Sequence, residues 1–453
     1  MANFDPVTFG AREGEQDNSA AFCRTLAAIK EAGGGVLKIG PGMWRTGPME
    51  ISSHTTLELE EGTVLSFIPE PERFLPVWSR WEGVECFCFH PLIFASGQED
   101  ITIQGKGCID GNGLVWWNLL REKRKRGQIE PESPQEKELA RLNTNYRFQP
   151  SGGGGRYLQF LRPPLLQFFR CSGIRVEGIH LVNSPFWTVH PVFCRDLVFR
   201  NISISNPAES PNTDGMDIDS CADVLIENCH IVVGDDGIAL KSGAGTDAIQ
   251  TGSPTRNVTI RDCTIEKGHG GIVIGSETAS GISGVLAEDC LFKGTDRGIR
   301  IKTRRGRGGL IHNLEFRNLI MENNLCPLAI NMYYRCGAEG ELGKPGGCFS
   351  QESIPISTAT PSIKNIRISG IKANDCRASA GFIAGLPESP VENITLLDCS
   401  FSTDENSGIS PQESDMFLGI PETVEKSFRL LNVKTTEFSG VTITGPAKAF
   451  IYQ

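Results

Sequence analysis

From Leu37 onward, apolar and polar positions alternate in short runs, which is the pattern of β-strands with one buried face. The runs end in Asn, Asp or Gly, residues that favour turns. They share one order: a polar residue, alternating apolar residues, Asn or Asp with a small residue, and a second short strand. Such runs begin at Asp100, Gly173, Asp196, Asp223, Asn257, Gly284, Asn313, Asn365 and Asn393.

The spacing of these runs predicts the fold. Successive starts lie mostly about 25–35 residues apart, a period typical of solenoid proteins. One such unit is too small to bury a core alone, so stacked units must share one. The sequence therefore predicts an all-β, single-stranded right-handed parallel β-helix, with residues 1–453 as one domain. A β-propeller is the second alternative, although its blades are usually longer and four-stranded.

Three segments depart from the repeat. Residues 17–32 combine helix-capping residues with helical apolar spacing, which predicts a helix that covers the N-terminal end of the stack. Residues 113–165 contain a charged helical stretch followed by SGGGG, and residues 334–362 are rich in Gly, Pro and Ser. We interpret the last two as loop insertions that shape a cleft. The alternative is that they are only tolerated excursions.

The composition limits the classes of binding partner and the cellular location that we expect. The net charge of −10 argues against nucleic-acid binding, which needs a basic surface. No stretch reaches the ~18 apolar residues of a membrane span, and the N-terminus lacks a leader pattern. The fifteen cysteines lack metal-ligand spacing, and Cys229, Cys263 and Cys290 recur at one repeat position, which predicts a ladder of free thiols. We expect a cytoplasmic protein without metal or cofactor, although removal of a leader would leave the same sequence.

Titratable residues recur about one repeat apart. Residues one coil apart lie above one another, so the motifs predict one strip of three carboxylates, one imidazole and two cations, with further positive charge beside it. Taken singly, each residue has a structural explanation, because an Asp in a turn usually bonds its own backbone. That explanation would suffice for Asp219 or Asp223, whereas Asp217 allows either a structural or a functional role, and we favour the structural one. The strip consists of Asp214, Asp235, Asp236, His269, Arg300 and Lys302, and the neighbouring cations are Arg304, Arg305 and Arg307.

The pair Asp235 and Asp236 is flanked by Gly234 and Gly237. Glycines permit a β-bulge or a strained turn, either of which lets both carboxylates face outward. Clustered carboxylates raise the proton affinity of one of them. One acid then stays protonated while its neighbours are ionised, which is the division that glycoside hydrolysis needs. Inverting enzymes hold the two carboxyl groups about 6.5–9.5 Å apart.

Four motifs at these positions resemble the signature of glycoside hydrolase family 28, the polygalacturonases. The similarity runs from the FGAREG segment through at least Tyr334. The motifs are Asn212-Thr213-Asp214, Asp235-Asp236, Gly268-His269-Gly270 and Arg300-Ile301-Lys302.

The resemblance implies a right-handed parallel β-helix that hydrolyses α-1,4-galacturonosyl linkages with inversion. It implies that Asp235 is the general acid and that Asp214 and Asp236 activate water. His269 would tune the protonation of the acid. The two cations of the RIK motif would bind a galacturonate carboxylate.

The resemblance also implies weaker candidates for substrate contact. Tyr334 matches a downstream family tyrosine, although Tyr333 is adjacent. His190 lies in a segment similar to one that lines the family's cleft, and Asn212 belongs to the first motif. The stretch Trp78–Gly83 and its continuation look most like bacterial exo-acting members.

Four hypotheses follow. The leading one is an exo-acting polygalacturonase on pectic oligosaccharides, and the second is a rhamnogalacturonan or unsaturated-galacturonide hydrolase. A pectate lyase is disfavoured, because that chemistry needs a calcium cluster and an arginine base. The non-enzyme alternative is a carbohydrate-binding β-helix, since a fold alone does not determine function.

Overall fold

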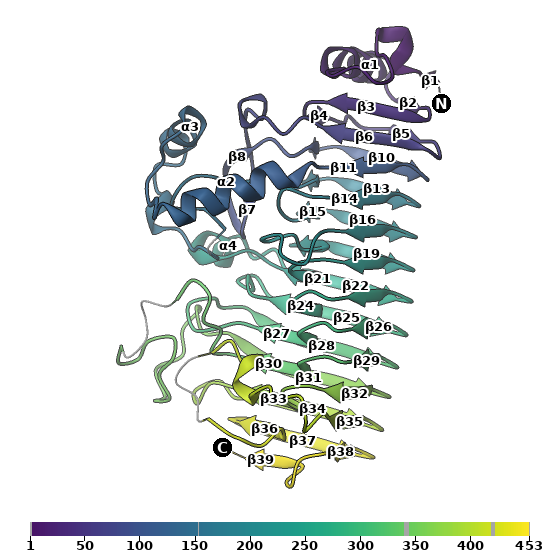
Figure 1. The fold of residues 1–453 in the computed structure, drawn as a ribbon. Helices are drawn as coiled ribbons and strands as arrows, with labels where there is room; N and C mark the ends of the chain where they lie inside the picture. The colour runs from purple at the N-terminus through teal and green to yellow at the C-terminus, as the bar shows by residue number, and fades with distance from the viewer. Residues whose placement is uncertain (1, 153, 339–343, 418–421, 453) are drawn as a thin grey trace. The chain divides into compact units, whose positions relative to one another are not determined.

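The computed structural model describes residues 2–152, 154–338, 344–417 and 422–452. Short parallel strands dominate these residues, and helices are few (Figure 1). The chain divides into two compact units, Met1–Asp235 and Asp236–Gln453. The prediction of one domain over residues 1–453 stays a prediction.

In the first unit, three parallel sheets take their strands in turn, so the chain coils. The first sheet contains β1 (Asn3–Phe4), β2 (Gly35–Ile39), β5 (Thr55–Leu59), β10 (Glu99–Gly105), β13 (Ser172–Glu177), β16 (Arg195–Arg200) and β19 (Ala222–Glu227). The second contains β3 (Gly42–Thr46), β6 (Thr63–Phe67), β11 (Cys108–Asp110), β14 (His180–Val182), β17 (Ser203–Ser205) and β20 (His230–Val232). The third contains β4 (Met49–Glu50), β9 (Ile93–Ser96), β12 (Leu166–Phe169), β15 (Val189–Val192) and β18 (Met216–Asp219).

The second unit repeats this arrangement. Its first sheet contains β22 (Thr255–Arg261), β25 (Ile282–Glu288), β28 (Leu310–Arg317), β31 (Ser362–Ser369), β34 (Val391–Leu397) and β37 (Val433–Ser439). Its second contains β23 (Thr264–Glu266), β26 (Leu291–Lys293), β29 (Ile320–Glu322), β32 (Lys372–Cys376), β35 (Ser400–Thr403) and β38 (Thr442–Thr444). Its third contains β21 (Asp236–Lys241), β24 (Gly270–Gly275), β27 (Arg297–Lys302), β30 (Cys326–Asn331), β33 (Gly381–Ala384), β36 (Phe428–Leu431) and β39 (Phe450–Tyr452).

The predicted parallel β-helix is confirmed, and it is right-handed, as parallel crossovers nearly always are. The coil interior holds stacked aliphatic side chains, such as Ile174 on Leu197 and Leu197 on Val224. Polar residues alternate with them on the outside, as the period of two requires.

The repeated Asn and Cys positions have distinct structural roles. Asn201 and Asn228 turn the chain at positive φ, and the Asn228 amide donates to Asn201 Oδ1 at 2.7 Å. All fifteen cysteines are free, so the thiol prediction is confirmed. Sequence reasoning missed a second thiol ladder, in which the backbone N–H groups of Cys171 and Cys194 donate to the sulfur of the next cysteine in the stack.

The helix predicted over residues 17–32 is α1 (Ser19–Glu31), which packs its apolar face at the N-terminal end of the first unit (Figure 1). Short helices elsewhere are η1 (Pro6–Phe9), η2 (Pro71–Arg73), α4 (Gly245–Thr251) and η5 (Pro411–Ser414). Among the described residues, no helix is both long and apolar enough to cross a membrane.

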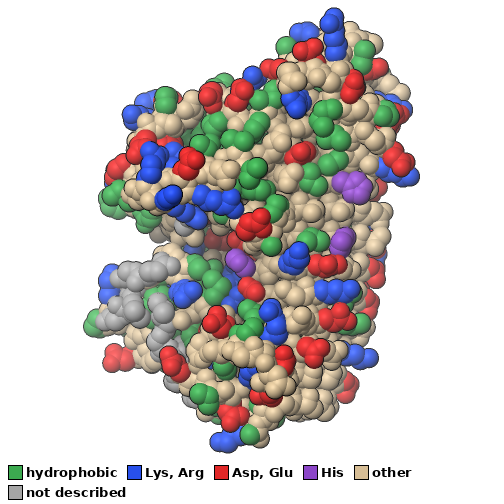
Figure 2. All heavy atoms as spheres, viewed as in Figure 1, with side chains coloured by type: hydrophobic (Ala, Val, Ile, Leu, Met, Phe, Trp, Pro, Cys, Tyr) green, Lys and Arg blue, Asp and Glu red, His purple; other side chains and the backbone are tan. Residues whose placement is uncertain are grey.

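The two predicted insertions differ in content. The described part of 113–165 folds into α2 (Gly113–Lys125), α3 (Pro134–Leu142) and η3 (Tyr146–Phe148). Described residues 344–361 contain no helix or strand, and 339–343 lie outside the described residues. The sequence did not predict the antiparallel hairpin of β7 (Pro76–Trp81) and β8 (Val84–Phe89). Figure 2 shows charged side chains of both signs scattered over the visible face.

Candidate active site

Asp214 and Asp235 form the carboxylate pair of the first unit. Asp214 lies just before β18, and Asp235 is the last residue before β21. One oxygen of each lies within 4.8 Å of the other.

Arg162 holds the turn that carries Asp214. Its guanidinium is buried and donates to the carbonyl oxygens of Pro185 and Pro211, each at 2.8 Å, and to Asn212 Oδ1 at 2.8 Å. Asn212, a predicted substrate contact, is therefore already a partner of Arg162.

The charge of Arg162 also acts on the carboxylate pair. Burial lowers the pKa of Arg162, and nearby Arg124 lowers it further, whereas Asp235 and Asp214 raise it. Sequence reasoning missed Arg162, because nothing in its local pattern marks it.

His190 is buried on β15 and belongs to a polar network. Its Nδ1 lies 2.8 Å from Gln167 Nε2, and its Nε2 lies 3.9 Å from Asp219 Oδ2. Gln167 Oε1 accepts from the Ser79 hydroxyl at 2.7 Å. His190 is thus linked to the β7 strand through Gln167 and Ser79, a contact that the sequence similarity did not predict.

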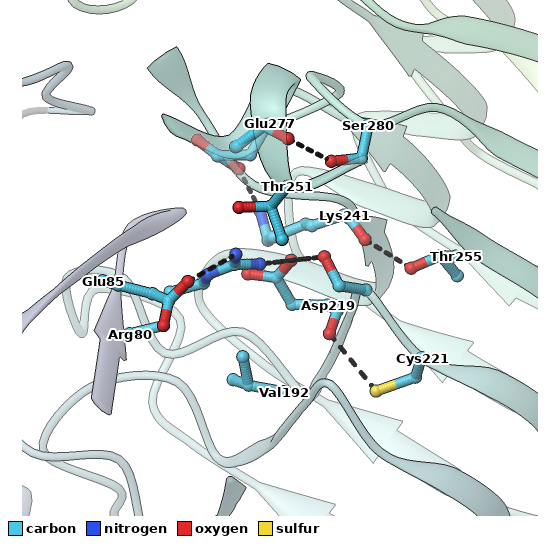
Figure 3. Close-up of polar contacts among 12 residues, drawn as sticks. Arg80, Glu85, Val192, Asp219, Cys221, Lys241, Thr251, Thr255, Glu277 and Ser280 are labelled. Atoms are coloured by element: carbon cyan, nitrogen blue, oxygen red, sulfur yellow. Dashed lines mark hydrogen bonds and ion pairs between the residues drawn. The ribbon is translucent and has the colours of Figure 1, made fainter. Parts of the chain in front are cut away.

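Arg80 connects the β7–β8 hairpin to β18 (Figure 3). Its Nη1 donates to Asp219 Oδ1 at 2.8 Å and to the Ser220 hydroxyl at 2.9 Å, and its Nη2 lies 3.8 Å from Glu85 Oε1. Asp219 is a buried strand residue, so the interpretation of Asp219 as a turn aspartate was wrong. Asp217 is equally buried on the same strand.

Asp236 is the central carboxylate of the second unit. Arg300 Nη1 donates to Asp236 Oδ1 at 2.8 Å, and Lys302 Nζ donates to Asp236 Oδ2 at 2.5 Å. The exposed fractions are 1% for Asp236, 4% for Arg300 and 6% for Lys302. Burial raises the pKa of Asp236, but Lys302, Arg300 and Lys241 outweigh it and hold the net pKa well below its ordinary value. Asp236 is therefore ionised at neutral pH.

The strand register corrects the idea that these residues lie directly above one another. Arg300 is in register with Val273, and Val273 with Ala239, so the Arg300 side chain reaches back along the sheet to Asp236. Arg300 and Lys302 share one face of β27, as predicted, since both reach the same carboxylate.

The glycines beside the aspartates do not make a bulge. The pairing of β21 with β24 keeps one register, and neither Gly234 nor Gly237 has a positive φ. A Cβ at Gly234 would lie 2.6 Å from the Pro207 carbonyl oxygen, and one at Gly237 would lie 2.7 Å from Ile265. The pairing of β21 with β24 therefore contains no bulge, and both positions need glycine for its small size.

His269 and Tyr334 lie near the cations. His269 is exposed just before β24, and its carbonyl oxygen accepts weakly from Arg300 Nη1 at 3.5 Å. The Tyr334 ring centroid lies 5.7 Å from the Arg300 guanidinium and 5.3 Å from Lys302 Nζ. Tyr333 is fully buried, and burial raises its pKa to about 12. Tyr334 is thus the tyrosine beside the RIK motif.

A second buried ion pair in this unit was missed. Lys241 Nζ donates to Glu277 Oε2 at 2.9 Å (Figure 3), and Arg307 Nη1 lies 3.9 Å from Glu277 Oε1. Burial raises the pKa of Glu277, but Lys241 and Arg307 outweigh it and hold the net pKa far below its ordinary value.

Two of the predicted neighbouring cations are used for local structure. Arg305 forms an ion pair with Glu388 at 2.6 Å, and Arg304 donates to the carbonyl oxygens of Tyr334 and Cys336. Arg305 also donates to the carbonyl oxygens of Gly347 and Ser350, so both cations help to organise the loop after β30. Their contribution to the positive field beside the site stays a prediction.

The carboxylates fit a metal poorly. Asp214 and Asp235 are close enough to share a cation. Both oxygens of Asp236, however, already accept from Arg300 and Lys302, which compete with any metal for its lone pairs. The arrangement favours acid–base chemistry with a buried ion pair.

Comparison with known proteins gives consistent matches. The family model described as "Glycosyl hydrolases family 28" matches residues 147–407. A probable polygalacturonase of Vitis vinifera is 33% identical over 69% of this chain, and the chain spans 59% of that protein's length. The exopolygalacturonase of Thermotoga maritima aligns over 98% of this chain and 92% of its own, with 27% identity and a TM-score of 0.76. The Erwinia carotovora polygalacturonase, at 18% identity and a TM-score of 0.64, shares the fold.

Proposed function

Because the chain belongs to glycosyl hydrolase family 28, we propose that it hydrolyses α-1,4-galacturonosyl linkages in pectic oligosaccharides. The observation that carries this proposal is the buried set of Asp236, Arg300 and Lys302, with Asp235 immediately before Asp236 in the chain. A substrate with a carboxylate on each sugar complements the two cations.

The charge environment separates the roles of the aspartates. In our proposal Asp235 donates a proton to the leaving glycosidic oxygen, and Asp214 takes a proton from the attacking water. A carboxylate whose pKa is strongly lowered is a weak proton acceptor. We therefore assign Asp236 to orienting the water and to stabilising positive charge at the anomeric carbon. His269 would tune the protonation of Asp235.

We propose that the enzyme attacks chain ends and releases galacturonic acid with inversion. The exo mode is supported by the relative from Thermotoga maritima, whose title names an exopolygalacturonase, and by the β7–β8 hairpin and the α2–α3 insertion, which are suited to restrict a cleft. Inversion rests on the family resemblance.

The test is a time course on a defined galacturonate oligomer labelled at its reducing end. Monomer as the first product supports end-wise attack, and fragments of intermediate size refute it. Proton NMR of the fresh product identifies the anomer, and initial release of the α-anomer contradicts inversion. Faster turnover of rhamnogalacturonan oligosaccharides than of galacturonate oligomers would refute the proposed substrate.

We also propose a cytoplasmic location, supported by the fifteen free cysteines. Fractionation of cells that express the protein from its own gene tests this. Recovery in the extracellular or periplasmic fraction would contradict it.

A further inference from the structure

The segment that follows η5, residues Asp415 to Phe417, is held rigidly beside the third sheet of the second unit. Arg297 donates to the Ser414 carbonyl oxygen through Nε at 2.9 Å and Nη2 at 2.6 Å. Arg429 forms a buried ion pair with Asp415 through both Nη atoms, and Asn331 Nδ2 donates to the Asp415 carbonyl oxygen at 3.0 Å. Buried side chains from three strands thus fix this segment.

Met416 sits at the centre of this segment, against Arg300. Its φ of 50° is unusual for a residue other than glycine, and such a conformation persists only where the surroundings hold it. Its carbonyl oxygen accepts from the Arg335 N–H, and the next residue, Phe417, forms an antiparallel bridge with Tyr334. Its Sδ atom lies 2.8 Å from Arg300 Nη2.

The two sides of the Arg300 guanidinium therefore meet different acceptors. Nη1 donates to the Asp236 carboxylate, a strong charge-assisted bond. Nη2 donates to a thioether sulfur, which is a weak acceptor. A carboxylate that accepts from Nη2 would form a stronger hydrogen bond than the one that the sulfur gives up.

We propose that Met416 is a positioning and specificity-determining residue that orients Arg300 Nη2 and yields it to the carboxylate of a uronic acid. This inference rests on the proposed function, since it takes Arg300 as a substrate-binding group. The weak sulfur acceptor keeps the guanidinium oriented before binding and gives way on binding. A strong neutral acceptor at residue 416 would compete with the substrate.

The experiment compares Met416→Leu, which keeps the volume and removes the acceptor, with Met416→Gln, which supplies an amide oxygen. Hydrogen bonds to charged groups are strong enough that we expect Met416→Gln to raise KM for a galacturonate oligomer about tenfold. We expect kcat to stay within about threefold and Met416→Leu to stay within about threefold of wild type in both constants. Glu413→Gln, an exposed change in the preceding helix η5, is the matched control.

Calorimetric binding of the same oligomer and thermal unfolding are measured for every variant. The inference is overturned if Met416→Gln binds and reacts like wild type, or if both variants weaken binding equally. A wild-type protein that binds the oligomer without cleaving it refutes the proposed function, and the binding ratio of the two variants still decides the inference. A wild-type protein that does not bind it refutes both.

Discussion

The two units hold their candidate site carboxylates in different ways. In the first unit, Asp214 and Asp235 lie within 4.8 Å of each other, and the nearby cation Arg162 is bonded to the backbone and to Asn212. In the second unit, Asp236 receives direct bonds from Arg300 and Lys302. In our proposal the two aspartates adjacent in sequence therefore have different tasks, with Asp235 as the proton donor and Asp236 as an anion that Arg300 and Lys302 hold in place.

The largest effect expected from this difference is on catalysis by the first unit. Asp235→Asn removes the proposed proton donor, and we expect kcat to fall about 10²–10⁴-fold, the usual contribution of a general acid. Release of reducing ends from a galacturonate oligomer measures it. Asp196→Asn, an exposed change at a position where Asn tolerates the positive φ, should leave kcat unchanged. An Asp235→Asn variant that retains most of its turnover would remove the distinction between the two aspartates.

The next effect concerns the fixed anion of the second unit. Lys302→Met removes one of the cations that lower the pKa of Asp236, and breaking a buried pair costs about 3 kcal/mol of unfolding free energy at neutral pH. The folded-state pKa of Asp236 lies below the unfolded value of 3.8, so its stabilisation is present above about pH 4 and is lost as the pH falls.

With one cation fewer, the pKa of Asp236 rises toward its unfolded value. The variant should therefore lose stability at a higher pH than wild type. Acid titration followed by circular dichroism measures the midpoint. Lys293→Met, an exposed lysine of the same unit, is the control. Equal acid midpoints for Lys302→Met and wild type would mean that Asp236 is not held by this pair.

A third change tests whether the first unit also depends on a buried ion pair. Arg80→Met removes the Arg80–Asp219 interaction between the β7 strand and β18, with an expected loss of about 3 kcal/mol. The double variant with Asp219→Asn should recover part of that loss, because the buried charge is removed as well. Urea unfolding of the single and double variants gives the coupling energy, with exposed Arg175→Met as control. No coupling would mean that the hairpin is held by packing alone.

The smallest effect is expected on the outer turns, which belong to neither group of site residues. Asn228→Ala places a Cβ residue at a φ of 50° and removes the bond to Asn201, for a loss of about 1 kcal/mol. Asn228→Gly should lose less, because glycine adopts this conformation freely. Thermal unfolding ranks the two variants, and unchanged turnover in both would show that the turns act on stability only. The reverse ranking would assign the stability to the side-chain bond.

The fold could be predicted from the sequence because the repeat period is visible in the alternation of apolar and polar residues and in the turn residues. The alternation within the RIK motif also predicted that Arg300 and Lys302 share a face, whereas the roles of the motif residues stay predictions. The sequence could not predict contacts between a repeat and an irregular segment. Arg80 meets Asp219 across 139 residues, and Arg300 meets Met416 across 116, and no periodicity relates either pair.

The failed predictions have physical reasons as well. Gly234 and Gly237 suggested backbone freedom, but the structure uses their lack of a side chain, and only packing reveals this difference. Asp219 suggested a turn, but a cation from an inserted hairpin allows it to be buried on a strand. A residue type limits the possible roles, and its partners select among them.

The thiols have a practical consequence for labelling. Cys23 on α1 is the one exposed cysteine, whereas Cys108, Cys336 and Cys348 are half-buried and the others are buried. Burial raises the pKa of Cys108 to about 11, so only a small fraction of the Cys108 side chains is thiolate at neutral pH. A maleimide dye in modest excess should therefore attach first at Cys23, far along the chain from every candidate catalytic residue, and give a fluorescent reporter without any engineered cysteine.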